Sequence, residues 1–534
     1  MKIVYSRPFL NGELYEPPLG IAHIAAYVKE KLPDTEQEVF DLDVLQYKKD
    51  RIFKELKRVK PDICCISIFS YNRFEGFELA KMAKEAGAFV ILGGQHTTFM
   101  DKDTLENLPF IDIIIRGEAE ATLVEFLRRF KNNEPYDDVA GISFRNKKGE
   151  VIRNPDREFI DITNIPMPAY ELFPTARYKY YGVMGGRGCP YNCNFCGSPQ
   201  FWKRKLRLRN AHNVVDEIEY LVKTYGKKIV HMKDDVFTFN KQWAKDVCNE
   251  IIRRKLDIQW ECLTRVNLVD EELLRTMKKS GCNLIEYGIE SGSNEMLKTI
   301  NKASTLDLAR RAVKMTRDAG IRYGTFFMVG HPGEAEKTLE ETFKFALELR
   351  GDSITFTLTD AIPGTELYQL ALREKNIPEG FVWSKSDKRN LSGYPVPRFQ
   401  NKNLPEEKML EYSRRFLMRF AIGRLFDLKD RRDYEYVFKN EYVPYHITIK
   451  TMKDAKIFLE ELKKGIKCAS ATKYRLKGYA FLPFFLGRLA NNHLKRLYRK
   501  TKIKVKAFDG RIHKEAANEQ KEETSVIVEV PQPA

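Results

Sequence analysis

Apolar and polar positions along roughly the first 130 residues alternate between two patterns. Short runs such as Asp62–Phe69 and Ile111–Ile115 are almost continuously apolar, whereas segments between them, such as Gly20–Lys31, carry apolar residues at helical spacing. Apolar strands separated by amphipathic helices are typical of a parallel sheet covered by helices on both faces. The pattern predicts an α/β domain with a doubly wound parallel sheet, whose ligands bind at the carboxyl ends of the strands.

A second series of strand and helix patterns follows between about residues 178 and 377. Its expected strands are Gly182–Gly185, Ile229–Met232, Trp260–Leu263, Leu284–Ile289, Gly324–Val329 and Ile354–Leu358. Such a series of βα units predicts a partial (β/α)6 barrel, with its chemistry at the carboxyl ends of the strands. The intervening stretch lacks this rhythm, apart from a hairpin expected around Lys147–Gly149.

Length and composition support a multidomain protein. The chain has 534 residues, of which 43% are hydrophobic and 12% aromatic, and this excludes a mainly disordered protein. We expect a doubly wound domain, a linker, a barrel, a basic and mainly helical region, and a disordered tail. These five segments are expected over residues 1–135, 136–175, 176–390, 391–510 and 511–534.

The positive charge is concentrated near the C-terminus. The chain has a formal net charge of +17, and Lys450–Lys506 alone holds 17 lysines and arginines against 3 acidic residues, a net +14. Such a segment, which also carries clustered aromatics, suits contact with a membrane surface or a lipid substrate, a cap over the barrel mouth, or nucleic acid. The chain shows no RNA-binding signature, which disfavours nucleic acid.

The N-terminus has no apolar run of signal-peptide length, and the apolar segment Tyr479–Leu489 is too short to cross a bilayer. These observations predict a cytoplasmic protein, with peripheral contact at the inner membrane surface through residues 450–506 as an open alternative.

Three cysteines stand in one short loop directly after the first strand of the second series. They are Cys189, Cys193 and Cys196, in a CxxxCxxC spacing with glycines and Pro190 beside them. A structural zinc site normally takes four protein ligands. A 4Fe–4S cluster held by three cysteines leaves one iron open to another ligand. A zinc loop or chance clustering remains the alternative to a cluster.

This loop resembles the signature of the radical S-adenosylmethionine (radical SAM) superfamily, including an aromatic residue, Phe195, before the last cysteine. The resemblance implies that SAM binds the open iron, and that the reduced cluster cleaves SAM to a 5′-deoxyadenosyl radical that abstracts hydrogen from a substrate. It also implies an electron donor such as flavodoxin or ferredoxin.

Segments at the ends of the later barrel strands resemble further motifs of this superfamily. Asp235 is expected to accept the SAM amino group, and Asp234 to partner or orient it. The resemblance implies no catalytic side chain beyond the cluster ligands. The residues that it implies for SAM binding are Phe195, Asp234, Asp235, Arg265, Glu290, Ser291, Gly330 and Pro332.

The first domain resembles the cobalamin-binding domain of B12-dependent radical SAM enzymes, in the segments around Gly20, Gly93 and Glu118. The residues implied for cobalamin are Ser67, Gly93, Gly94, Glu118 and Glu120, of which the two glutamates would serve either the nucleotide tail or the domain contact. The DxHxxG motif that supplies a histidine to cobalt elsewhere is missing, so the cobalt ligand is open. A sheet that only caps the barrel is the alternative.

Together, the two resemblances favour a cobalamin-dependent radical SAM methyltransferase that acts on a carbon centre of a small molecule, with a weak preference for a lipid or other hydrophobic substrate. The same architecture also supports cyclisation, oxidation or rearrangement, as in the anaerobic magnesium-protoporphyrin ester cyclase type. A non-catalytic cobalamin or SAM sensor with a basic tail is the alternative from another class.

Overall fold

The computed structural model describes residues 1–9, 16–178 and 180–426. The chain divides into two compact units, Met1–Phe420 and Ala421–Ala534. All the contacts discussed below lie within the first unit. The basic segment Lys450–Lys506 and the tail expected over residues 511–534 lie outside the described residues.

The N-terminal sheet is doubly wound, as predicted. Its strand order is β2-β1-β3-β4-β5-β6-β7, with parallel pairing from β2 through β5 and antiparallel pairing at β6 and β7. The strands are β1 (Lys2–Arg7), β2 (Glu36–Asp41), β3 (Ile63–Ser67), β4 (Phe89–Gly93), β5 (Ile113–Ile115), β6 (Ile142–Arg145) and β7 (Val151–Arg153). The predicted hairpin around Lys147–Gly149 joins β6 and β7, so the expected linker contributes two strands to this sheet. The domain boundaries themselves remain predictions.

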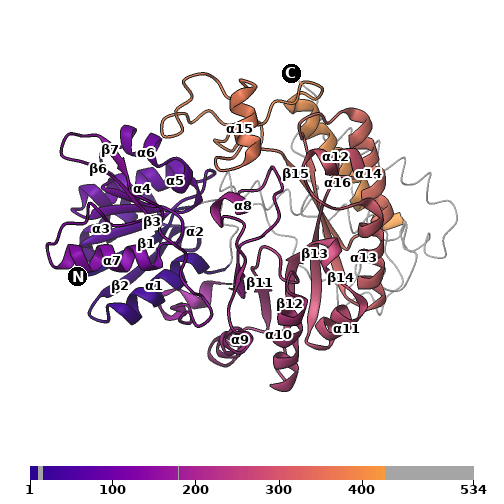
Figure 1. Ribbon diagram of the computed structural model, residues 1–534, viewed down its shortest axis with the longest axis horizontal. Helices are drawn as coiled ribbons and strands as arrows, with labels where there is room; N and C mark the ends of the chain where they lie inside the picture. Colours follow the sequence, from indigo (N-terminus) through magenta and orange to yellow (C-terminus); the bar gives the residue numbers. More distant parts are fainter. Residues whose placement is uncertain (10–15, 179, 427–534) are drawn as a thin grey trace, which may run out of the picture. The chain divides into compact units, whose positions relative to one another are not determined.

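Helices cover both faces of this sheet (Figure 1). Successive side chains of a strand point to opposite faces, and those on both faces are buried. On β1, Ile3 and Tyr5 belong to the core beneath helices α1 and α7, whereas Val4 belongs to the core on the opposite face. The helices of this domain are α1 (Leu19–Lys31), α2 (Leu42–Leu45), α3 (Lys49–Val59), α4 (Arg73–Glu85), α5 (Gln95–Phe99), α6 (Asp101–Asn107) and α7 (Glu120–Lys131).

The second sheet is the predicted partial barrel. Its six strands are all parallel, in the order β15-β14-β13-β12-β11-β8, so β8 and β15 form its two edges. The strands are β8 (Tyr181–Val183), β11 (Ile229–Met232), β12 (Gln259–Thr264), β13 (Cys282–Glu290), β14 (Arg322–Val329) and β15 (Ser353–Leu358). Their carboxyl ends therefore meet along one rim.

Helices follow the barrel strands, and several of them begin at polar caps. The side chain of Asn240 accepts a hydrogen bond from the Trp243 N–H, and that of Asp270 accepts one from the Leu273 N–H, which fixes where α10 and α11 begin. These helices are α9 (Ala211–Tyr225), α10 (Lys241–Arg253), α11 (Glu271–Lys279), α12 (Asn294–Thr299), α13 (Leu306–Asp318), α14 (Glu336–Leu349) and α15 (Glu366–Arg373).

Short elements lie in the connection between the two sheets and in the loops of the barrel. They are the 3-10 turns Tyr170–Leu172, Thr175–Arg177 and Val266–Leu268, the two-residue strands β9 (Gly186–Arg187) and β10 (Arg207–Leu208), and α8 (Ser198–Phe201). Beyond residue 390 the structure describes one helix, α16 (Glu406–Phe426), whose Phe416 ring stacks on Phe343 with centroids 4.3 Å apart. Within the described ranges, no helix is both long enough and apolar enough to cross a bilayer.

Candidate functional site

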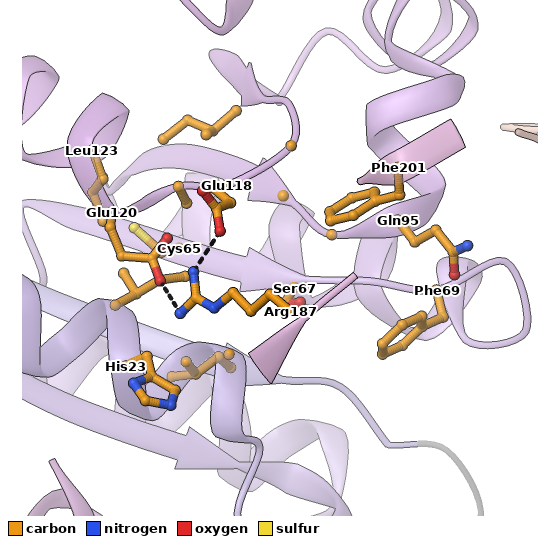
Figure 2. A pocket seen from close by; sticks show the side chains of 18 of the residues that line it. His23, Cys65, Ser67, Phe69, Gln95, Glu118, Glu120, Leu123, Arg187 and Phe201 are labelled. Atoms are coloured by element: carbon orange, nitrogen blue, oxygen red, sulfur yellow. Dashed lines mark hydrogen bonds and ion pairs between the residues drawn. The ribbon is translucent and has the colours of Figure 1, made fainter. Parts of the chain in front are cut away.

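A cavity of about 580 Å³ lies at the carboxyl end of the N-terminal sheet and reaches the cysteine loop of the barrel (Figure 2). The ends of β3, β4 and β5 and the loop before α8 contribute to its lining. Residues expected at two different cofactors therefore share one cavity, and these are Ser67, Gly93, Gly94, Glu118, Glu120, Cys196 and Asp235. This arrangement brings the two predicted sites together.

Gly94 lets the chain after β4 pack closely against Ile68, just beyond the end of β3. Its backbone has a φ of +98°, which favours glycine, and a Cβ atom there would lie 2.5 Å from the Ile68 carbonyl oxygen. The Ser67 hydroxyl would lie only 3.1 Å from the same Cβ. Gly94 also lines the cavity at the carboxyl end of the parallel sheet, where such sheets bind ligands. This position fits the tail of a bound cofactor such as cobalamin.

Glu118 and Glu120 connect the N-terminal domain to the barrel. Arg187, two residues before the first loop cysteine, donates from Nη1 to Glu118 and from Nη2 to Glu120, each at 2.7 Å. Arg207 adds a second ion pair to Glu118 at 2.8 Å. Burial alone would lower the pKa of Arg187, but the charges of Glu120 and Glu118 raise it above its ordinary value. The sequence left two roles open for these glutamates, at the nucleotide tail or at the domain contact. In the structure both form ion pairs of the domain contact.

The cysteine loop is fixed by backbone hydrogen bonds to two distant parts of the barrel. The Asn194 N–H donates to the Ile300 carbonyl at 3.2 Å, and the Leu367 N–H donates to the Asn194 carbonyl at 2.9 Å. Cys193 is buried, Cys189 and Cys196 are half-buried, and all three are free thiols. Burial raises the pKa of Cys189, and it raises that of Cys196 to about 12. Because the thiolate and not the thiol binds metal, a bound metal would have to lower these pKa values.

The loop offers three thiols as possible metal ligands. A tetrahedral zinc ion with Zn–S bonds of about 2.3 Å needs its sulfur ligands within about 4 Å of one another. Among the described residues, no group of three or more Cys, His, Asp or Glu side chains is gathered closely enough to hold one metal ion. A 4Fe–4S cluster takes each thiolate on a different iron and so accepts a wider spacing. The donor set therefore fits such a cluster.

Two neighbouring aspartates after β11 have different surroundings. Asp234 is buried and accepts a hydrogen bond from the Gly185 N–H at 3.2 Å, and burial raises its pKa to about 7. Asp235 accepts a hydrogen bond from the Ser198 hydroxyl at 2.6 Å and lines the cavity. Burial also raises the pKa of Asp235. Asp234 thus orients the strand before the cysteine loop, whereas Asp235 presents its carboxylate to the cavity.

Arg265 places positive charge beside the cysteine loop. Its Nη1 lies 3.4 Å from the Cys193 sulfur, and its guanidinium lies over the Tyr191 ring, 3.7 Å from the centroid. Arg265 is only 5% exposed, so solvent screens this charge weakly. The position suits an anionic ligand next to Cys193.

The remaining residues expected at SAM have protein partners of their own. Glu290 pairs with Lys302 at 2.6 Å, and the Ser291 hydroxyl lies 3.1 Å from the Thr342 hydroxyl. The Gly330 N–H donates to Glu334 at 2.5 Å, and Pro332 follows it, half-buried. The Phe195 ring centroid lies 5.7 Å from that of His331. In the described part of the chain, these five and Arg265 are not among the residues that line the cavity.

Several residues at the site were not anticipated from the sequence. Arg187 carried a usable signal, since it is a charged residue between two glycines directly before Cys189. Arg207 carried none, because its partner Glu118 lies 89 positions away. Tyr5 and His23 also line the cavity, but each occupies an ordinary core position of its strand or helix pattern.

Two family models match consecutive parts of the chain. Residues 9–127 match the B12 binding domain, and residues 183–346 match the Radical SAM superfamily. An uncharacterized methyltransferase from Pyrococcus horikoshii is 34% identical over 368 residues, which cover 67% of this chain and 78% of that protein. An anaerobic magnesium-protoporphyrin IX monomethyl ester cyclase from Cereibacter sphaeroides is 30% identical over 447 residues, which cover 79% of this chain and 71% of that protein.

Solved structures show the same fold. The radical S-adenosylmethionine methyltransferase TsrM from Kitasatospora setae, solved with cobalamin and a [4Fe-4S] cluster bound, superposes with a TM-score of 0.67. It is 17% identical in sequence, and the match covers 88% of this chain and 100% of that chain. The succession of a doubly wound domain and a partial barrel is therefore an established architecture.

Proposed function

Because this chain belongs to the radical SAM enzymes that carry an N-terminal B12-binding domain, we propose that it transfers a methyl group to a carbon atom of a small hydrophobic molecule. The protein is an enzyme, and its cofactors are a 4Fe–4S cluster, SAM and cobalamin. When bound, these groups supply a radical that abstracts hydrogen and a methyl group that is carried on cobalt.

One observation carries this proposal. A single cavity is lined by Ser67, Gly93 and Gly94 at the end of the N-terminal sheet and by Cys196 and Asp235 of the barrel. Transfer of a methyl group to a substrate radical requires the methyl carrier and the radical source to reach the same atom of the substrate. A cavity shared by both predicted cofactor sites supports this geometry.

The side chains around the cysteine loop would bind and orient SAM. The Asp235 carboxylate lines the same cavity as Cys196 and can accept hydrogen bonds from an amino group. The positive charge of Arg265, next to Cys193, suits a carboxylate. Asp234 accepts the N–H groups of Gly185 and Gly186 and so supports the start of the loop. Together these residues match the two charged groups of an amino acid.

Methyl transfer is favoured over cyclisation by the identity of the relatives. The relative from Pyrococcus horikoshii, named a methyltransferase, is 34% identical, and the cyclase from Cereibacter sphaeroides is 30% identical. A cyclase-type oxidation is therefore the second candidate. Incubation with SAM labelled in its methyl group separates them, because only methyl transfer leaves the label in the product. Formation of 5′-deoxyadenosine with an unlabelled product would favour the cyclase type.

The substrate class, electron donor and membrane contact form a second part of the proposal. The aromatic and basic segment Lys450–Lys506 supports a hydrophobic substrate and peripheral contact with an anionic membrane surface. Reduction of the cluster requires a donor such as flavodoxin or ferredoxin. Co-sedimentation with anionic and neutral liposomes over a salt series tests the membrane contact, and failure to bind either would favour a structural cap.

A further inference from the structure

A group of exposed cations follows the cysteine loop closely along the chain. The segment from Lys203 to Arg209 contains five basic residues and no acidic one. Arg207 and Arg209 point inward to glutamates whose side chains are almost fully buried. Lys203, Arg204 and Lys205, here called the basic turn, are exposed instead. These three charges therefore belong to the surface of the protein.

The backbone of the basic turn has an uncommon conformation. Lys203 and Arg204 have φ values of +50° and +56°, in the left-handed region that residues with side chains rarely adopt. The Arg204 N–H donates to the Pro199 carbonyl at 3.0 Å, and the Lys205 N–H donates to the Trp202 carbonyl at 2.9 Å. Backbone strain of this kind persists where the surroundings impose it, and it is concentrated at functional sites.

The basic turn packs directly on the cysteine loop. The Arg204 Nε donates to the carbonyl of Pro190, the residue after Cys189, at 3.2 Å. Gly188, the residue before Cys189, lies so close to the turn that a Cβ atom there would overlap the Lys205 carbonyl oxygen. Strands β9 and β10 pair with each other on either side of the loop and the turn. The basic turn therefore lies beside the first of the three cysteines.

Most of the charge of the basic turn is not neutralised by the protein. Lys203 pairs with Asp156 at 3.3 Å, but this carboxylate also pairs with Arg116 at 3.0 Å. Arg204 and Lys205 form no ion pair with any described residue. Exposed charges of one sign attract a partner of the opposite sign and speed its association. The basic turn thus suits a negatively charged partner that must come close to the cysteine loop.

Reduction of the cluster is a step that requires such a partner. The donor loses one electron and the cluster gains it, and no bond is formed or broken. Electron transfer slows steeply with distance, so a protein that donates the electron has to dock near the cysteine loop. An anionic membrane surface or a nucleic acid has no such need, and the position of the turn therefore favours an electron carrier.

We propose that the basic turn is the docking surface for an acidic one-electron carrier protein that reduces the cluster. Carboxylates of the carrier would pair with Arg204 and Lys205, the two cations that have no ion-pair partner in the described chain. The Trp202 ring packs against Phe159 with centroids 6.1 Å apart and supports the turn from below. This inference rests on the proposed function, because only a bound cluster gives the carrier its role.

Direct binding is the first test, with oxidised flavodoxin, an acidic carrier, titrated into the reconstituted protein by calorimetry. Arg204→Glu combined with Lys205→Glu should weaken binding at least about tenfold at low salt. The difference should vanish in 1 M salt, where charges are screened beyond about 3 Å. The control is Lys278→Glu combined with Lys279→Glu, which makes the same charge change at exposed lysines. These lie just before the amino end of β13, away from the cysteine loop at the carboxyl rim, and the control should keep its affinity.

The rate of cluster reduction is the second test, followed by stopped-flow absorbance. Reduced flavodoxin should reduce the Arg204→Glu, Lys205→Glu variant at least about tenfold more slowly than the wild type at low salt. Reduced methyl viologen, a small cation, should reduce the variant at least as fast as the wild type, because the new charges attract it. The opposite response of the two reductants separates docking from damage to the loop.

The proposal is overturned if the double variant binds flavodoxin and accepts its electron as well as the control does. Slower reduction by both reductants would also overturn it, since the loop itself would then be damaged. So would a wild type that does not bind flavodoxin at low salt, or a double variant that loses only binding to anionic liposomes. None of these measurements involves substrate turnover, so their failure leaves the proposed methyl transfer to be judged by labelled SAM alone.

Discussion

Replacement of Arg187 by methionine tests the contact between the N-terminal domain and the barrel. The change removes the cation that pairs with Glu120, a carboxylate in a residue that is only 3% exposed. Glu118 keeps its second partner, Arg207, at 2.8 Å. Loss of one partner of a buried ion pair costs about 3–5 kcal/mol, because the remaining charge is left uncompensated. We expect Arg187→Met to lower the free energy of unfolding of the apo-protein by this amount.

Urea unfolding of the apo-protein measures this loss. The matched control is Arg310→Met, which removes an exposed ion pair with Glu348 at 2.6 Å and should cost less than about 1 kcal/mol. Adding Glu120→Gln to Arg187→Met removes the uncompensated charge and should restore part of the stability. The reasoning is refuted if Arg187→Met costs no more than the control, or if the double variant is no more stable than the single one.

Three further predictions concern the cluster, the cobalamin site and pH. Alanine at any one of the three loop cysteines should abolish both iron incorporation and SAM cleavage. The control is Cys248→Ala, which changes a buried cysteine on α10 and should retain both. SAM cleavage that persists in any loop variant would contradict the assignment of the cluster ligands. In Gly94→Ala the new Cβ would lie 2.5 Å from the Ile68 carbonyl oxygen, so the reconstituted protein should lack the cobalamin absorbance spectrum. The control Gly87→Ala, at a glycine with a similar φ of +96° and open space around it, should retain that spectrum. Burial raises the pKa of Glu334 to about 7, so its protonated form stabilises the folded state below about pH 4.5 and this contribution is lost as the pH rises through 7. Glu334→Gln should reduce this loss of folding stability with rising pH, measured by urea unfolding at a series of pH values. A pH profile unchanged from that of the wild type would contradict the prediction.

The parallel strands of both sheets were predictable because most of them are apolar runs with buried side chains. Strand β11 occupies the expected residues Ile229–Met232, and β14 begins two residues before the expected Gly324. A series of continuous apolar runs between amphipathic helices is compatible with few folds other than a parallel sheet covered by helices. The edge hairpin was harder to place, since β6 joins the sheet only through antiparallel pairing with β5. Local pattern predicts a hairpin but does not show which strand it will join.

The candidate site was predictable where its residues are close in sequence. The cysteine loop is a local motif, and its spacing is visible in the printed sequence. The ion pair between Arg187 and Glu118 joins residues 69 positions apart, so only the folded chain brings them together. Tyr5 and His23 were missed for another reason. Each fits the apolar pattern of its element, and only the absence of a partner within the described residues distinguishes them.

The central claim is methyl transfer by a radical SAM enzyme, and one measurement tests it most directly. The protein is reconstituted with iron, sulfide and cobalamin, reduced, and incubated with methyl-labelled SAM and a hydrophobic extract of the source cells; Cys193→Ala serves as the control. We predict 5′-deoxyadenosine together with a product that carries the label in a new carbon-bound methyl group, and neither with the control. Formation of 5′-deoxyadenosine with no label in any product would contradict the claim.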